Sequence, residues 1–254
     1  MCDDICMETN LTKRAKYFAH RKHDEIGQIR KYTGEPYWVH VDAVAKIVAE
    51  HGGNEFQIAA SYLHDTLEDT KTTYMELISQ FGIEVTDLVK ELTDVYTSES
   101  FPKDKRAWRK AKEAERTSKI SDKAKLIKLA DLNDNTHSIV KHDADFAKTY
   151  LREKANMLKG FQNVNKELYA KVEKQLQDSL DSLGLSWYIV RMKEKIIEYY
   201  VREVYGNKLG YIKDPADAAL IQRLTGKKTI DLATRNTITD LSGNRILFQQ
   251  VMFA

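Results

Sequence analysis

The sequence predicts an all-α helical bundle followed by a C-terminal extension with a short β-hairpin. The 254 residues contain only three prolines and eleven glycines, so few positions interrupt a helix. Apolar residues recur at helical spacing through most of the chain, and extended patterns appear only after Gly206. This length allows one large domain, or one domain with an appendage.

The first elements are predicted from capping residues and apolar faces. Asn10 is expected to cap a helix that buries Leu11, Ala15 and Phe18 on one face. The polar segment 24–36 contains glycine and proline and is expected to be a loop. A second helix is expected to begin at Tyr37 and to end before Gly52-Gly53.

A helix over residues 54–69 is predicted next. Asn54 followed by Gln57 has the pattern of a capping box. His64-Asp65 and Glu68-Asp69 stand in its last turns, where a four-residue spacing groups them into one polar patch. Further helices are predicted over 72–80, 83–92, 122–140, 143–160, 163–183 and 186–205.

A domain boundary is predicted near Gly184, which separates a domain over 1–184 from an extension of unknown role over 185–254. In the extension, the hairpin is expected from two extended segments and a turn, at 229–232, 246–251 and Ser242–Asn244.

The composition excludes several classes of protein. A formal net charge of +2 does not favour nucleic acid or a membrane surface as partner. The two cysteines, Cys2 and Cys6, cannot form a disulfide framework, which fits a reducing compartment. No stretch reaches the roughly 18 apolar residues of a membrane span, and the acidic start is no signal peptide, so we expect a cytoplasmic protein.

Four residues have the chemistry of a metal site. His40, His64, Asp65 and Asp131 come from three separated segments, and two imidazoles with two carboxylates match the ligands of a divalent transition metal. Taken singly, the same residues are compatible with a satisfied core histidine and solvated acids. Their combination favours the metal site.

A polar stripe runs along the apolar helix that carries Asp131. Lys128, Asp131, Asn135 and Ser138 are spaced three, four and three residues apart, which places them on one face. A buried carboxylate needs a partner. Lys128 alone could provide it, but a stripe ending in an amide and a hydroxyl is better suited to a polar ligand.

Cationic groups suggest an anionic ligand. Arg30 and Lys31 could contact phosphate or a base, although their charge alone favours an ordinary charged loop. Segment 103–128 holds eleven Lys or Arg against four Asp or Glu, as in either a solvated amphipathic helix or a basic rim that attracts a nucleotide. Phosphate-binding and serine-hydrolase glycine motifs are absent from the sequence.

Residues from about 10 to 160 resemble the HD-domain hydrolases of the Rel/Spo group, which includes small alarmone hydrolases. The matching pieces are Ala19–His23, Tyr32–Tyr37 with His40, Leu63–Thr70, Phe81-Gly82, Leu92–Asp94, and Lys128–Asp131 with Asn135. The resemblance implies Mn²⁺ held by His40, His64, Asp65 and Asp131. It also implies removal of pyrophosphate from the 3′ position of (p)ppGpp, giving GDP or GTP.

The resemblance further implies residue roles. Glu68 and Asp69 would position or activate the attacking water, Arg30 and Lys31 would contact the nucleotide, and Asn135 and Ser138 would contact the nucleoside. Segment 132–134 stands where bifunctional members carry a more basic stretch.

Two alternatives stay open. One is a phosphohydrolase that acts on another nucleotide or a dinucleotide cofactor, and the other is a catalytically silent binding module. The C-terminal region is also a candidate for regulating the pocket or for pairing two chains.

Overall fold

The computed structural model describes residues 9–136, 139–185, 195–204, 207–241 and 246–251. The chain forms two compact units, residues 1–176 and residues 177–254.

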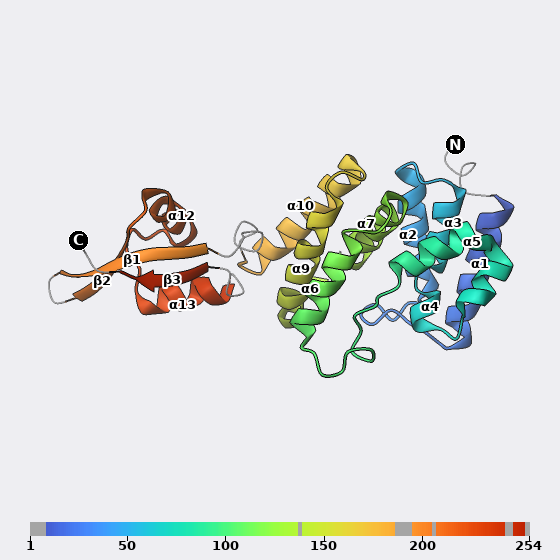
Figure 1. Cartoon of the computed structure of the whole chain (residues 1–254), viewed down its shortest axis with the longest axis horizontal. Coiled ribbons are helices and arrows are strands. Elements are labelled where there is room, and N and C mark those ends of the chain that lie inside the picture. The colour runs from blue at the N-terminus through green and yellow to red at the C-terminus, as the bar shows by residue number, and fades with distance from the viewer. Residues whose placement is uncertain (1–8, 137–138, 186–194, 205–206, 242–245, 252–254) are drawn as a thin grey trace. The chain divides into compact units, whose positions relative to one another are not determined.

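Helices build the described part of the first unit, as predicted (Figure 1). They are α1 (Asn10–Glu25), α2 (Trp38–Glu50), α3 (Glu55–Leu63), α4 (Thr66–Asp69), α5 (Tyr74–Leu92), α6 (Arg106–Thr117), α7 (Asp122–Thr136), α8 (Ile139–His142), α9 (Ala144–Leu158), a 3₁₀ turn (Lys159–Phe161) and α10 (Lys166–Ser182), which continues into the second unit.

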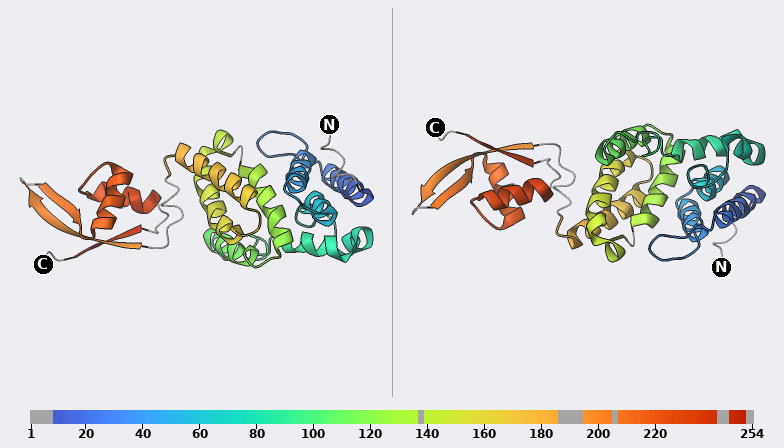
Figure 2. Two further views of the ribbon diagram at one scale, coloured as in Figure 1. Left: turned by 90° about the horizontal axis from the view of Figure 1, so that it is seen from above. Right: turned by 90° about the horizontal axis from the view of Figure 1, so that it is seen from below.

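Helix α3 is the centre of the first unit. Ile58, Ala59, Ala60 and Leu63 are almost fully buried, and α1, α2, α5 and α7 pack against this helix. The small alanine side chains let neighbouring helices approach closely. Figure 2 shows from two sides how the helices of this unit surround one another.

Side-chain caps begin the helices close to the expected positions. The capping box of Asn54 and Gln57 is confirmed, with both reciprocal hydrogen bonds present. The cap of α1 was predicted one residue late, because Thr9 and not Asn10 accepts the backbone N–H of Thr12. The loop predicted over 24–36 begins later than expected, because residues 24 and 25 still belong to α1; residues 26–36 form the loop, which is closed by a bridge between Ile29 and Pro36.

The prediction of one helix over 54–69 was wrong. Helix α3 ends at Leu63, and a separate turn, α4, follows after His64 and Asp65. The Thr66 hydroxyl donates to the Leu63 carbonyl at 2.7 Å, which satisfies an acceptor that the end of the helix leaves free. The two predicted helices around Phe81-Gly82 are present as the halves of α5, kinked at Gly82.

Helix α7 is the second element that positions the site. Its apolar side chains are buried on several sides, so Lys128 and Asp131 lie inside the protein. Helices α7 and α8 together cover most of the predicted helix 122–140, apart from residues 137–138, which lie outside the described residues.

The second unit contains a three-stranded sheet in the order β2-β1-β3. Strand β1 (Lys195–Val204) pairs antiparallel with β2 (Asn207–Ile212) and parallel with β3 (Ile246–Gln250). Helices α12 (Pro215–Thr225) and α13 (Leu232–Leu241) pack on one face of this sheet through Ile221 and Ile238 (Figure 2).

The helix predicted over 186–205 was wrong for residues 195–204, which form β1. A β-hairpin is present, but β1 and β2 form it, and not the two segments that were expected. Of those segments, 246–250 is strand β3, whereas Ile230 makes only an isolated bridge with Gly210. The predicted turn Ser242–Asn244 lies outside the described residues.

Among the described residues, every helix is too short or too polar to cross a membrane.

Candidate active site

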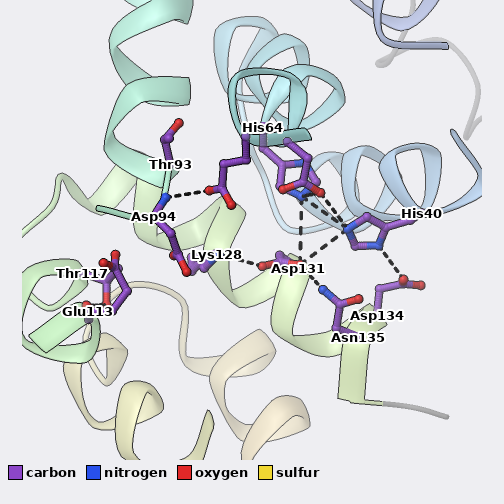
Figure 3. Close-up of polar contacts among 12 residues, drawn as sticks. His40, His64, Thr93, Asp94, Glu113, Thr117, Lys128, Asp131, Asp134 and Asn135 are labelled. Atoms are coloured by element: carbon purple, nitrogen blue, oxygen red, sulfur yellow. Dashed lines mark hydrogen bonds and ion pairs between the residues drawn. The ribbon is translucent and has the colours of Figure 1, made fainter. Parts of the chain in front are cut away.

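The candidate metal ligands converge from the start of α2, the junction of α3 with α4, and the middle of α7 (Figure 3). The Nε2 atoms of His40 and His64 lie 3.3 Å apart. The Asp65 Oδ2 atom lies 2.9 Å from Nε2 of His64 and 3.6 Å from Nε2 of His40. The Asp131 Oδ1 atom lies 3.5 Å and 4.0 Å from Nε2 of His40 and His64, respectively.

Both imidazoles are held through their other nitrogen. Nδ1 of His40 lies 2.7 Å from a carboxylate oxygen of Asp134, and Nδ1 of His64 lies 2.8 Å from the carbonyl oxygen of Ser61. With the proton on Nδ1, each Nε2 presents a lone pair to the centre of the group. Tyr37 donates its hydroxyl to Asp65 at 2.6 Å and so fixes this carboxylate as well.

Asp131 is embedded in polar contacts along α7. Nζ of Lys128 lies 3.0 Å from Oδ2 of Asp131, and the Asn135 amide donates to Oδ1. The ion pair that the sequence left open is therefore present. Asp131 also keeps its Oδ1 atom beside both imidazoles, so Lys128 does not occupy the whole carboxylate.

Glu68 and Asp69 have different hydrogen-bond partners, although both lie close enough to Asp65 for its charge to raise their pKa. Glu68 accepts the backbone N–H of Asp94 at 2.6 Å, and Asp94 in turn pairs with Lys110 at 2.8 Å. Asp69 accepts the side-chain amide of Gln28 at 2.8 Å. The break between α3 and α4 explains the divergence, because the spacing of a continuous helix does not apply across it.

The predicted substrate contacts are only partly brought together. Arg30 reaches the site, since its guanidinium lies 2.7 Å from the Asp134 carboxylate. Lys31 is exposed and lies over the rings of Tyr32 and Phe146 instead. Ser138 lies outside the described residues.

Burial and charge set the protonation of the site. Burial disfavours the charged imidazole of His40, but hydrogen bonds with Asp134 and Asp65 raise its pKa to about 9. Burial would raise the pKa of Asp131, yet Lys128, His64 and His40 lower it to about 2. Part of Glu68 reaches solvent, but its carboxyl group is largely desolvated by the surrounding protein, which raises its pKa to about 7.

Several residues around the site were missed by sequence reasoning. Tyr37 and Asp134 contact the candidate ligands directly, and Lys154 of α9 lies close enough to Lys128 for that charge to lower its pKa, after the larger effect of burial. Tyr37 comes three residues before His40, and Asp134 comes three residues after Asp131. Spacing alone does not single out either residue, because Tyr37 contacts Asp65 and Asp134 contacts His40, each on another element.

The donor set fits a divalent metal. His40, His64 and Asp65 each offer one ligand atom, and these atoms lie within 4.8 Å of one another. Two imidazole nitrogens, which give up their protons when a metal binds, and carboxylate oxygens suit a borderline transition metal. Two imidazole nitrogens 3.3 Å apart beside two carboxylates are a costly buried arrangement that a shared cation would stabilise.

Comparison with known proteins agrees with this geometry. Residues 15–161 match the HD domain family. A Xenopus tropicalis protein named guanosine-3′,5′-bis(diphosphate) 3′-pyrophosphohydrolase MESH1 is 32% identical over 176 residues, which are 66% of this chain and 94% of that protein. The human protein of the same name is 35% identical over 159 residues, which are 59% of this chain and 84% of that protein.

Two further likenesses extend the comparison. An Aquifex aeolicus guanosine-3′,5′-bis(diphosphate) 3′-pyrophosphohydrolase is 46% identical over 83 residues, but the match spans only 33% of this chain and 12% of that longer protein. A solved structure described as a metazoan ortholog of SpoT that hydrolyzes ppGpp superposes with a TM-score of 0.60 at 26% identity, over 67% of this chain and 96% of that one.

Residues 15–161 contain each of the candidate metal ligands. The relative from Xenopus tropicalis, which is matched over 94% of its own length, is named a guanosine-3′,5′-bis(diphosphate) 3′-pyrophosphohydrolase. The chain therefore belongs to the HD domain family of hydrolases and, within it, to the family of guanosine-3′,5′-bis(diphosphate) 3′-pyrophosphohydrolases.

Proposed function

We propose that this chain removes the 3′-pyrophosphate of (p)ppGpp in a Mn²⁺-dependent hydrolysis that yields GDP or GTP and pyrophosphate. The observation that carries the proposal is the convergence of His40, His64, Asp65 and Asp131, since Nε2 and carboxylate oxygen atoms from three segments meet within 4.0 Å of their neighbours. The names of the relatives supply the substrate.

These four side chains would hold the metal ion. When bound, the ion supplies a water of lowered pKa and polarises a phosphoryl oxygen. Manganese suits a mixed shell of nitrogen and oxygen ligands with water in the open positions. Lys128 keeps Asp131 ionised, and Tyr37 holds Asp65 in place.

Glu68 is the best candidate for the general base. Its pKa of about 7 lets it accept a proton at neutral pH, and the backbone N–H of Asp94 fixes one of its oxygens. Asp69 lies on the same short turn as Glu68 and accepts a hydrogen bond from Gln28. It would orient the water from a second direction.

Cationic side chains would receive the phosphates. Burial alone would raise the pKa of Asp94, but Lys128, Lys110 and Lys154 lie close enough to lower it together. Arg30 approaches from the other side, on the loop before α2. Such groups stabilise the charge that develops on the leaving pyrophosphate.

Product analysis tests the proposal. The protein is incubated with ppGpp and Mn²⁺, and the products are separated from those of a reaction with EDTA. We expect equal amounts of GDP and pyrophosphate, with no product in EDTA. Release of orthophosphate, or no hydrolysis of ppGpp by metal-loaded protein, would contradict it.

The same assay separates the two alternatives. A panel of nucleoside phosphates and dinucleotide cofactors would show faster turnover than ppGpp if another nucleotide is the substrate. A silent binding module would hydrolyse none of them.

A further inference from the structure

Asp134 joins the metal side of the site to its nucleotide side. Its Oδ2 atom lies 2.7 Å from Nδ1 of His40 and 2.7 Å from a terminal guanidinium nitrogen of Arg30. One carboxylate oxygen therefore contacts both a candidate metal ligand and a candidate nucleotide contact. Figure 3 shows the His40 ring between Asp131 on one side and Asp134 on the other.

The contact with His40 decides which ring nitrogen carries the proton when the imidazole is neutral. The carboxylate accepts a hydrogen bond from Nδ1–H, so the lone pair is on Nε2 and this nitrogen becomes more electron-rich. His64 has a neutral acceptor in the same position, the carbonyl of Ser61. Of the two imidazoles, His40 therefore has the stronger support for binding a cation.

The contact with Arg30 fixes a side chain on an otherwise exposed loop. The backbone of Arg30 is already held, because its N–H donates to the Glu35 carbonyl at 2.8 Å. Its guanidinium is held by Asp134, and the two side chains are each 17% exposed. Without this carboxylate, the contacts of Arg30 within the site would be lost.

We propose that Asp134 is a positioning residue that holds His40 for the metal and Arg30 for the nucleotide through the same oxygen. The inference rests on the proposed roles of His40 and Arg30, and it assigns neither metal nor substrate contact to Asp134 itself. It predicts that one substitution weakens both metal binding and substrate binding.

Metal affinity in the absence of nucleotide tests whether Asp134 supports His40 in metal binding. Asp134→Asn keeps an acceptor oxygen but removes the charge, and Asp134→Leu removes both. We expect Mn²⁺ affinity, measured by titration calorimetry, to fall about 10–100-fold in Asp134→Leu and by a smaller factor in Asp134→Asn. Asp122→Asn is the matched control on the same helix, because its side chain is 79% exposed and far from these contacts in sequence.

Steady-state kinetics at saturating Mn²⁺ tests whether Asp134 holds Arg30 for nucleotide binding. Both Asp134 variants are expected to raise KM for ppGpp more than they lower kcat. Arg30→Gln should raise KM while leaving Mn²⁺ affinity unchanged. In the Asp134→Leu background, Arg30→Gln should have a smaller effect on KM, because Arg30 is already displaced there.

The outcomes are separable. Mn²⁺ affinity and KM within twofold of the parent in folded Asp134→Asn and Asp134→Leu would overturn the inference, as would a loss of thermal stability alone. If Asp134→Leu fails to fold, the same two readouts on Asp134→Asn decide. If the parent chain does not hydrolyse ppGpp but the Asp134 variants bind Mn²⁺ more weakly, the support of His40 by Asp134 would stand and the proposed function would be contradicted.

Discussion

Glu68 shows how a single side chain is tuned by its neighbours. Burial of its carboxyl group is the largest influence and raises the pKa, Lys128 opposes it, and the charges of Asp65 and Asp94 reinforce it. The result, about 7, is close to the ideal for a base that works near neutral pH.

Replacing Glu68 with Gln should separate chemistry from metal binding. We expect unchanged Mn²⁺ affinity and a kcat lower by about 10²–10⁴-fold, the usual contribution of a general base. Glu84→Gln, an exposed change on α5, is the control and should leave kcat unaltered. A parent-like kcat in Glu68→Gln would exclude it as the base.

The pH profile follows from the same pKa. Below its pKa Glu68 is protonated and cannot accept a proton, so kcat should fall tenfold per pH unit on the acid side. Because a bound cation favours the carboxylate, we expect kcat to begin this acid-side fall at or below about pH 7. The limb should be absent from the residual activity of Glu68→Gln.

Lys154 is a desolvated cation with few counter-charges. Among the described residues it makes no ion pair with a carboxylate, and its ammonium lies 5.0 Å from the centre of the Tyr150 ring. Burial and the charge of Lys128 both lower its pKa, as expected for an ammonium with too few counter-charges.

Lys154→Met should therefore raise the melting temperature by a few degrees while raising KM for ppGpp. Lys148→Met on the same helix is the control, since that side chain is 44% exposed and paired with Asp145. A Lys154→Met protein of lower stability and unchanged KM would show that the ammonium serves the fold instead.

At the scale of elements, the kink in α5 is set by Gly82. Its φ of +80° with ψ of 170° lies in a region that only glycine adopts readily. An added Cβ would meet nothing within 4 Å, so the cost of a substitution comes from the backbone alone.

Gly82→Ala is expected to destabilise the fold by about 1–3 kcal/mol. Chemical denaturation followed by circular dichroism measures this, with Gln80→Ala as an exposed control on the same element that should stay within about 0.5 kcal/mol of the parent. Equal stability of the two variants would mean that α5 can straighten.

The elements also show what local sequence could and could not predict. The capping box at Asn54 was predictable because its partners are three residues apart. The end of α3 at Leu63 was not, since no glycine or proline marks it and the bonds that stabilise it come from the following turn. Strand β1 was mistaken for a helix because its pairing partners β2 and β3 follow it in the chain, and a strand depends on such partners.

The candidate site divides in the same way. Ligand types were recognisable from the sequence because metal chemistry restricts them, and the structure brings all four together. The supporting contacts of Tyr37 and Asp134 were not recognisable from the sequence, because tyrosine and aspartate occur in many kinds of contact. Only the distances to Asp65 and His40 single them out.

At the scale of the whole molecule, the two units have separate cores. The second unit buries Ile197, Ile221, Ile238 and Ile246 among themselves. The described residues of the candidate site come from α2, α4, α6, α7, α9, the junction of α3 with α4, and the loops before α2 and after α5. Leu185 closes the end of α10, where its N–H donates to the carbonyl of Leu180.

A chain ending after Leu185 should consequently fold, bind Mn²⁺ with parent affinity and hydrolyse ppGpp. Circular dichroism, calorimetry and sedimentation measure fold, metal binding and mass together. A changed kcat would assign regulation to residues 186–254. A parent with two chains per particle and a truncated protein with one would assign pairing of two chains to them. Loss of folding would place part of the first unit's stability in that segment.

The stoichiometry of metal binding tests the central claim most directly, because the claim is that three distant segments bind one ion. Electron paramagnetic resonance of Mn²⁺ during titration should give one bound ion per parent chain. His40→Ala, Asp65→Ala and Asp131→Ala, one variant from each segment, should each lose this ion and hydrolysis of ppGpp together. A parent chain that binds no ion, or variants that keep it at parent affinity, would contradict the account.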